Sequence, residues 1–304
     1  MKTIRVKVPA TTANLGPGFD ALGLALDLWN EAEFSFRDEG QVGVKVHGEG
    51  EGKLPTNAEN AVSKAALQLF ELANQTNYGI QINCLNRIPL GSGLGSSSAA
   101  TLTGMLGANA LLDNPFSDKE ILQFAIENEG HPDNVAPAML GGLVVSTPHE
   151  GSFLSVDLPV MPIQATVVLP DFDLPTKEAR AVLPKEVAFS DAIANLSYVS
   201  LVTEAFRRGD LDLLGKAMKD KLHQPYRLPL IPGAQAALEA AQKAGAAAAL
   251  SGAGPSVVAF SADRDPLIRE AMLMAFADAG LEARVFELGI SQNGAEVKTG
   301  LIDN

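Results

Sequence analysis

Residues 89–98 read PLGSGLGSSS and hold three glycines, four serines and no charged side chain. Glycine lets a backbone approach a ligand closely, and amides at the start of a helix attract anions through the helix dipole. We therefore predict that this run is a loop that binds phosphate. A flexible linker would join separate domains, whereas this run leads from a strand pattern into a helix pattern. The alternative is a tight strand-to-helix turn that binds nothing.

Three common phosphate-binding signatures do not fit this loop. Gly95 is not followed by the lysine of the motif G-x-x-x-x-G-K-[ST]. The dinucleotide fingerprint G-x-G-x-x-G fails because Ser96 stands at its last position. The signature set of the protein kinases is also absent. The phosphate loop must therefore be of another kind.

The elements that position this loop follow from hydrophobic periodicity and turn residues, which predict an α+β protein in two halves. Ser117 and Glu120 form a capping-box pattern at the start of one helix. The proline-containing passage 148–162 is the expected joint between the halves. Strands are expected at 4–10, 28–37, 41–50, 78–90, 141–147, 163–169, twice within 246–261, and at 282–289. Helices are expected over 56–75, 97–112, 117–130, 191–208, 211–222, 232–244 and 266–279, with one more opening at 176.

The composition limits what the protein binds. The chain has 304 residues, is 46% hydrophobic and carries a net charge of −13. Such a charge repels nucleic acid and anionic membranes, so we expect neither as a partner, and an anionic ligand needs a local site. The single cysteine, Cys84, excludes an internal disulfide and a multi-cysteine metal site. We find no signal peptide or membrane-spanning stretch and expect a cytoplasmic protein.

Three motifs resemble those of the GHMP kinases. Residues 89–97 fit the pattern P-x-G-x-G-L-G-S-S, residues 8–26 (VPATTANLGPGFDALGLAL) resemble the first motif, and residues 251–260 (SGAGPSVVAF) resemble the third. They occur in the family's order and span essentially the whole chain. The resemblance implies a GHMP kinase fold, with an N-terminal half like domain 2 of ribosomal protein S5 (residues 1–155) and a ferredoxin-like C-terminal half (residues 156–304). ATP would lie between them.

Within this family the chain is most similar to the homoserine kinases. The similarity lies in residues 129–142 (EGHPDNVAPAMLGG), 175–184 (PTKEARAVLP) and 223–233 (HQPYRLPLIPG). It implies phosphorylation of the L-homoserine hydroxyl by ATP with Mg²⁺, a step of threonine biosynthesis, and a homodimer. Two alternatives stay open, namely another small-molecule kinase of the family, such as a mevalonate-pathway kinase, and a non-catalytic ligand sensor.

The resemblance assigns the nucleotide and metal residues. Mg²⁺ would be held by a serine hydroxyl, Ser97 before Ser98, and by one glutamate, Glu129 before Glu127. We place the adenine pocket only loosely, around residues 55–60 and the strand before the loop. The ATP phosphates would be wrapped by Pro89, Leu90, Gly91, Ser92, Gly93, Leu94, Gly95, Ser96, Ser97 and Ser98.

The substrate residues follow from the charges of an amino acid. Arginines suit its carboxylate, and carboxylate or amide oxygens suit its ammonium group. Asn14 and Asp20 could instead serve a local turn. By the resemblance, Arg180 and Arg227 bind the carboxylate, Asn14 and Asp20 the ammonium group with Asp133 as a third candidate, and His131 and Gly254 complete the substrate site.

The resemblance implies that the catalytic residues are Asn134, Asp133 and Thr176. Asn134 lies where many family members have a catalytic aspartate, so we expect transfer without a dedicated enzymic base. Positioning and charge neutralisation carry most of the catalysis of phosphoryl transfer. Asp133 is the alternative base. Thr176 would contact the γ-phosphate region, or would be a plain helix N-cap.

Overall fold

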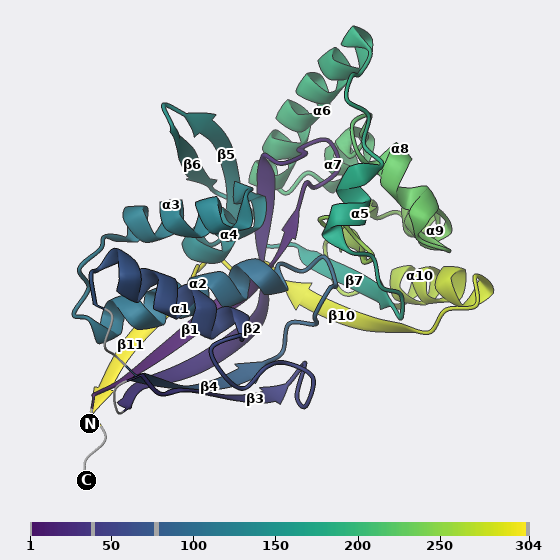
Figure 1. Cartoon of the computed structure of the whole chain (residues 1–304). Coiled ribbons are helices and arrows are strands. Elements are labelled where there is room, and N and C mark those ends of the chain that lie inside the picture. The colour runs from purple at the N-terminus through teal and green to yellow at the C-terminus, as the bar shows by residue number, and fades with distance from the viewer. Residues whose placement is uncertain (1, 38–39, 76–78, 302–304) are drawn as a thin grey trace.

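Figure 1 shows the computed structural model, which describes residues 2–37, 40–75 and 79–301. Residues 1 and 302–304, at the ends of the two predicted halves, lie outside the described residues. So does residue 78, where one strand was predicted to begin. Two sheets organise the rest. The first contains β1 (Lys2–Ala13), β2 (Leu22–Arg37), β3 (Val42–Gly48), β4 (Gly79–Asn86), β5 (Leu143–His149), β6 (Ser152–Leu158) and β11 (Glu296–Leu301). The second has the order β10 (Ala283–Gly289), β7 (Gln164–Pro170), β9 (Val257–Ser261) and β8 (Ala247–Leu250).

Four helices accompany the first sheet (Figure 1), and α2 begins within the predicted phosphate loop. The small residues of α2 let it lie close to its neighbours, and a Cβ at Gly107 would lie 2.4 Å from the ring of Phe34 on β2. This close packing holds the start of α2 in one place. The four helices are α1 (Ala61–Leu72), α2 (Ser96–Leu111), α3 (Asp118–Glu129) and α4 (Pro132–Leu140).

The remaining helices belong to the second half of the chain. Two of them, α9 and α10, pack on each other. The buried alanines of α9 and the buried Met272 and Phe276 of α10 share one core with β8 and β9. The helices are α5 (Thr176–Ala181), α6 (Phe189–Arg208), α7 (Leu211–Ala217), α8 (Gln224–Arg227), α9 (Ala234–Lys243) and α10 (Pro266–Asp278).

The structure differs from the predicted organisation around residues 148–162. Most of that passage is the hairpin of β5 and β6, in which Pro148 pairs with Phe153. The division at 155/156 therefore falls inside β6, and the chain leaves the first sheet only after Leu158. The last strand, β11, returns to this sheet beside β1. The segment 156–304 thus contributes strands to both sheets. The strands β6 and β11 and the helices α4 and α8 were not predicted.

Candidate active site

The predicted phosphate loop leads from β4 into α2, as expected. Gly95 precedes the helix in a left-handed conformation with φ of 70°. A Cβ at this position would lie 2.0 Å from Oγ1 of Thr11, so the close approach of β1 requires glycine. No side chain caps α2, which leaves its first-turn amides to a ligand. Ser251 Oγ donates to the Gly93 carbonyl at 2.8 Å and so packs the third motif against the loop.

The structure brings Glu129, and not Glu127, to this loop. Ser97 Oγ donates to one carboxylate oxygen of Glu129 at 3.0 Å, and Ser98 Oγ donates to the other at 3.2 Å. Thr101 Oγ1, one turn further along α2, donates to the first oxygen at 2.9 Å. Glu127 is exposed and accepts a hydrogen bond from Gln123 on its own helix. Three hydroxyls therefore surround one carboxylate at the end of α3.

His131, Asp133 and Asn134 lie at the start of α4, beside this carboxylate. The nearly buried Asp133 accepts from His131 Nδ1 at 2.9 Å. This hydrogen bond raises the pKa of His131 above its usual value, against the opposing effect of partial burial. Thr11 Oγ1 donates to Asn134 Oδ1 at 2.8 Å. Asn134 is therefore held in one orientation by β1.

Asp20 and Arg180 form a direct ion pair. The Arg180 guanidinium donates to both carboxylate oxygens of Asp20, at 2.8 and 3.0 Å. Both side chains are about one-third exposed. This hydrogen bonding raises the pKa of Arg180. Asn14 accepts from the Asp20 amide and donates to the Gly252 carbonyl, so its side chain supports the local turn, a role that can coexist with substrate binding.

Arg227 is buried, with 1% of its surface exposed, and lies over the same Phe19 ring as Arg180. Its Nε donates to the Ala179 carbonyl at 3.0 Å, and its guanidinium lies 5.1 Å from the ring centroid of Phe19. Burial, together with the positive charge of Arg180, lowers the pKa of Arg227 to about 10. A buried cation of this kind attracts an anionic group that can pair with it.

His223 links Arg227 to the loop that carries Asn14 and Asp20. Its fully buried ring donates through Nε2 to the Gly16 carbonyl at 2.8 Å, which leaves Nδ1 as the acceptor that faces Arg227 at 3.5 Å. Burial lowers the pKa of His223, against the opposing effect of the Asp220 carboxylate 3.4 Å from Nε2. Asp220 accepts from the amides of residues 222–224 and from Asn195, and fixes the chain next to the histidine.

One cavity of about 570 Å³ collects the predicted residues. Of the predicted site residues, Pro89, Leu90 and Leu94 do not line it. Thr176 does, and its N-cap alternative is wrong because Pro175 occupies that position. The lining includes Asn14, Asp20, Gly91, Ser92, Gly93, Gly95, Ser96, Ser97, Ser98, Glu129, His131, Asp133, Asn134, Thr176, Arg180, Arg227 and Gly254.

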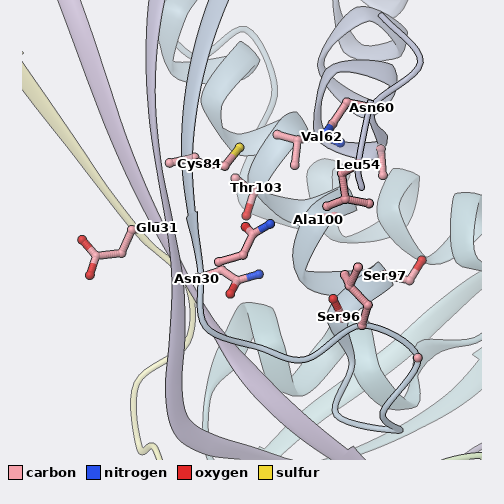
Figure 2. A pocket seen from close by; sticks show the side chains of 15 residues that line it. Asn30, Glu31, Leu54, Asn60, Val62, Cys84, Ser96, Ser97, Ala100 and Thr103 are labelled. Carbon is pink, nitrogen blue, oxygen red and sulfur yellow. Dashed lines mark hydrogen bonds between the residues drawn. The ribbon is translucent and has the colours of Figure 1, made fainter. Parts of the chain in front are cut away.

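A second, more apolar pocket of about 210 Å³ shares Gly91, Ser96 and Ser97 with this cavity. Figure 2 shows that Leu54, Val62 and Ala100 line it, with Asn30, Asn60 and Thr103 as polar neighbours. Asn60 lies within the region where the adenine pocket was expected, and Leu54 directly precedes that region. Cys84 also lines it, and burial raises the pKa of its thiol to about 12, so the thiol is unreactive.

Sequence reasoning missed Thr11, Thr101 and His223. Thr101 could have been found, because it lies four residues after Ser97 and three after Ser98, on the same face of α2. Thr11 and His223 both lie within motifs that were identified, but their roles depend on contacts with residues more than 100 positions away. Such contacts leave no periodic signal in a sequence.

The comparisons with known proteins agree with this site. Residues 60–142 match the family model of the GHMP kinases N terminal domain, and residues 202–275 match that of the GHMP kinases C terminal. A homoserine kinase from Moorella thermoacetica is 45% identical over 96% of this chain and 99% of its own length. One from Carboxydothermus hydrogenoformans is 41% identical over 95% of each chain.

Solved structures agree as well. The crystal structure of homoserine kinase from Cytophaga hutchinsonii has a TM-score of 0.87 and 36% identity over 97% of both chains. A mevalonate kinase from L. major, in complex with R-mevalonate, has a TM-score of 0.70 over 93% of this chain and 94% of its own, at 16% identity, and shares the fold alone. The predicted α+β fold of the GHMP kinases is confirmed. The chain belongs to the homoserine kinase family of the GHMP kinases.

Proposed function

We propose that the chain transfers the γ-phosphoryl group of ATP to the hydroxyl of L-homoserine. The observation that carries this proposal is the single cavity in which the phosphate loop meets two arginines and two aspartates. Homoserine offers a carboxylate for Arg180 and Arg227 and an ammonium group for Asp20 or Asp133. Mevalonate has a carboxylate but no ammonium group, so it would offer no cation to the carboxylates of Asp20 and Asp133.

The nucleotide would occupy both connected pockets. Its phosphates would lie against the loop amides and the start of α2, where the helix dipole favours negative charge. The apolar pocket beside Leu54 and Ala100 suits the flat face of an adenine ring. Among the described residues, no helix combines the length and the hydropathy that a membrane span needs.

The residues around Glu129 fit a magnesium ion. Mg²⁺ prefers oxygen ligands, and one or two carboxylates with waters and substrate phosphates suffice to hold it. Ser97 and Glu129 supply a hydroxyl and a carboxylate next to the phosphate loop. Nowhere in the described ranges do three or more His, Cys, Asp or Glu side chains gather around one metal position. When bound, the ion would neutralise phosphate charge.

The chain's own residues support transfer without a dedicated base. Asn134 cannot take up a proton, and its bond from Thr11 fixes its amide toward the cavity. Asp133 accepts from His131, and this bond suits an orienting role. The loop amides, Arg180 and Arg227 hold the two substrates in place, and positioning of this kind can supply most of the rate enhancement of phosphoryl transfer. A cytoplasmic location and a homodimer belong to the same proposal.

A coupled ADP-release assay with Mg·ATP tests the function, with L-homoserine compared with mevalonate, L-serine and L-threonine. Selective turnover of L-homoserine is the expected result. The variant Glu129→Gln should lose nearly all turnover. Its matched control, Glu127→Gln, should retain turnover. Turnover of mevalonate alone would refute the substrate assignment and leave the phosphate loop standing. An absence of any ATP turnover would favour a ligand sensor.

A further inference from the structure

The ring of Phe19 contacts three charged or polar side chains of the candidate site. The guanidinium carbon of Arg180 lies over the ring at 5.7 Å from its centroid, and that of Arg227 lies over it at 5.1 Å. The ring of His223 stacks on it, with the two centroids 5.2 Å apart and an angle of 23° between the planes. None of the roles predicted from the sequence falls on Phe19, although it directly precedes Asp20.

A tight turn holds this ring in place. The Gly18 amide donates to the Asn14 carbonyl at 2.9 Å, and the Leu22 amide donates to the Gly18 carbonyl at 2.9 Å. The next residue, Asp20, has a left-handed backbone with φ of 54°, and its amide donates to Asn14 Oδ1 at 3.0 Å. Hydrogen bonds on both sides of Phe19 therefore fix the direction in which its side chain leaves the turn.

The two arginines beside the ring carry like charges. Asp20 accepts two hydrogen bonds from Arg180, whereas Arg227 donates to the carbonyls of Ala179 and Gly252. Burial lowers the pKa of Arg227, and the positive charge of Arg180 lowers it further, so the two cations repel each other. The face of an aromatic ring carries partial negative charge and attracts a cation without neutralising it. Such a ring can hold both cations and leave their charge to an anionic ligand.

We propose that Phe19 is a positioning residue that holds Arg180 and Arg227 together for one carboxylate of the substrate. It acts through the arginines and not through a contact with the reacting atoms. Leucine would fill much of the same space but lacks the negative face, so the two cations would lose the group that attracts both. The identity of the carboxylate rests on the proposed function, whereas the contacts between the ring and the arginines do not.

Steady-state kinetics of Phe19→Leu and Phe19→Tyr provide the first test. We expect Phe19→Leu to raise KM for L-homoserine at least about tenfold, with kcat within about threefold and KM for ATP within about twofold of wild type. Phe19→Tyr keeps the aromatic face and should restore KM to within about threefold of wild type. The matched control is Phe286→Leu, because Phe286 is also partly buried and lies under an arginine, Arg284, at 5.5 Å, but does not line the cavity.

Three kinetic results would overturn the proposal. The first is an unchanged KM for L-homoserine in Phe19→Leu. The second is an equal rise in KM for ATP, which would indicate a general loss of structure. The third is an equal effect of Phe286→Leu, which would show that any lost aromatic contact with an arginine has the same result.

A double-mutant cycle on stability tests the contact without any substrate. Urea unfolding is measured for wild type, Phe19→Leu, Arg180→Met and the double variant. Arg180 and its partner Asp20 are each about one-third exposed, so Arg180→Met leaves no fully buried charge unpaired. We expect the two substitutions to be coupled by at least about threefold in the unfolding equilibrium constant.

The two tests together separate this proposal from the proposed function. Additive effects in the cycle, in a protein that turns over L-homoserine, would refute the role of the ring and keep the function. Coupling in a protein that does not turn over L-homoserine would refute the function and keep the contact of the ring with the arginine.

Discussion

The buried His223 offers the sharpest test of how the substrate site is held together. The ring has two roles, a donor at Nε2 for the Gly16 carbonyl and an acceptor at Nδ1 for Arg227. His223→Gln retains a donor near the position of Nε2, whereas His223→Asn retains an acceptor near that of Nδ1. The two variants therefore separate the two roles at similar size and polarity.

The distances predict which variant suffers more. The bond to Gly16 is 2.8 Å long and fully buried, whereas the contact with Arg227 is 3.5 Å and so lies at the limit of a hydrogen bond. A buried carbonyl that loses its donor costs about 1–3 kcal/mol. The Gly16 loop carries Asn14 and Asp20, so its loss should fall on substrate binding. We expect His223→Asn to raise KM for L-homoserine by about 5- to 150-fold, and His223→Gln to raise it much less.

Steady-state kinetics with each substrate varied in turn provide the assay, with the thermal midpoint of each variant as the control for folding. KM for ATP should change little, because His223 lies behind the Gly16 loop and not behind the phosphate loop. Equal effects of the two variants on KM for L-homoserine would refute the reasoning from bond length. A parallel rise in KM for ATP would show that the histidine supports the whole site.

Three further predictions follow from the site. Glu129→Gln should lower kcat by at least about a hundredfold at a saturating Mg²⁺ concentration, while Glu127→Gln should stay within about twofold of wild type, and magnesium titrations of both variants check this. Gly95→Ala should abolish ATP binding measured by calorimetry while leaving the protein folded in circular dichroism, because the new methyl group meets a buried threonine hydroxyl at the loop; normal ATP affinity would contradict this account of the loop. The pKa of His131 is raised in the folded protein by Asp133, so its contribution to stability is complete below the unfolded pKa of about 6.5 and is lost as the pH rises through the folded pKa. Thermal midpoints between pH 5 and pH 9 should therefore fall more for wild type than for His131→Gln, and parallel curves would exclude this effect.

Local patterns predicted most of the fold. The helix that begins after Ser117 starts at its capping box, with both reciprocal hydrogen bonds present. The strand β11 escaped prediction because its register, with Lys2 opposite Leu301, depends on pairing between distant parts of the chain. The hairpin partner β6 has no buried residue, so it lacks the buried alternation that marks a strand.

The site was predicted from motifs, and the structure adds what motifs cannot contain. The choice between Glu127 and Glu129 depends on the direction in which each side chain leaves α3, and two residues correspond to about 200° around a helix. Glu127 thus lies beside Gln123, and Glu129 points to the hydroxyls of α2. The ion pair of Asp20 with Arg180 could not be foreseen, because 160 positions separate its members.

The return of β11 to β1 limits how the cleft between the two sheets can open. The chain crosses from the first sheet to the second after β6 and crosses back after β10, so the second sheet is an insertion with two covalent attachments. The return segment is also tied to the first sheet, since Ser291 exchanges backbone hydrogen bonds with Ala25 and Gly142. Val167, Ala249 and Phe260 of the second sheet are moreover buried in the same hydrophobic core as the first sheet. Any opening of the cleft would therefore have to strain both chain crossings and disturb this shared core.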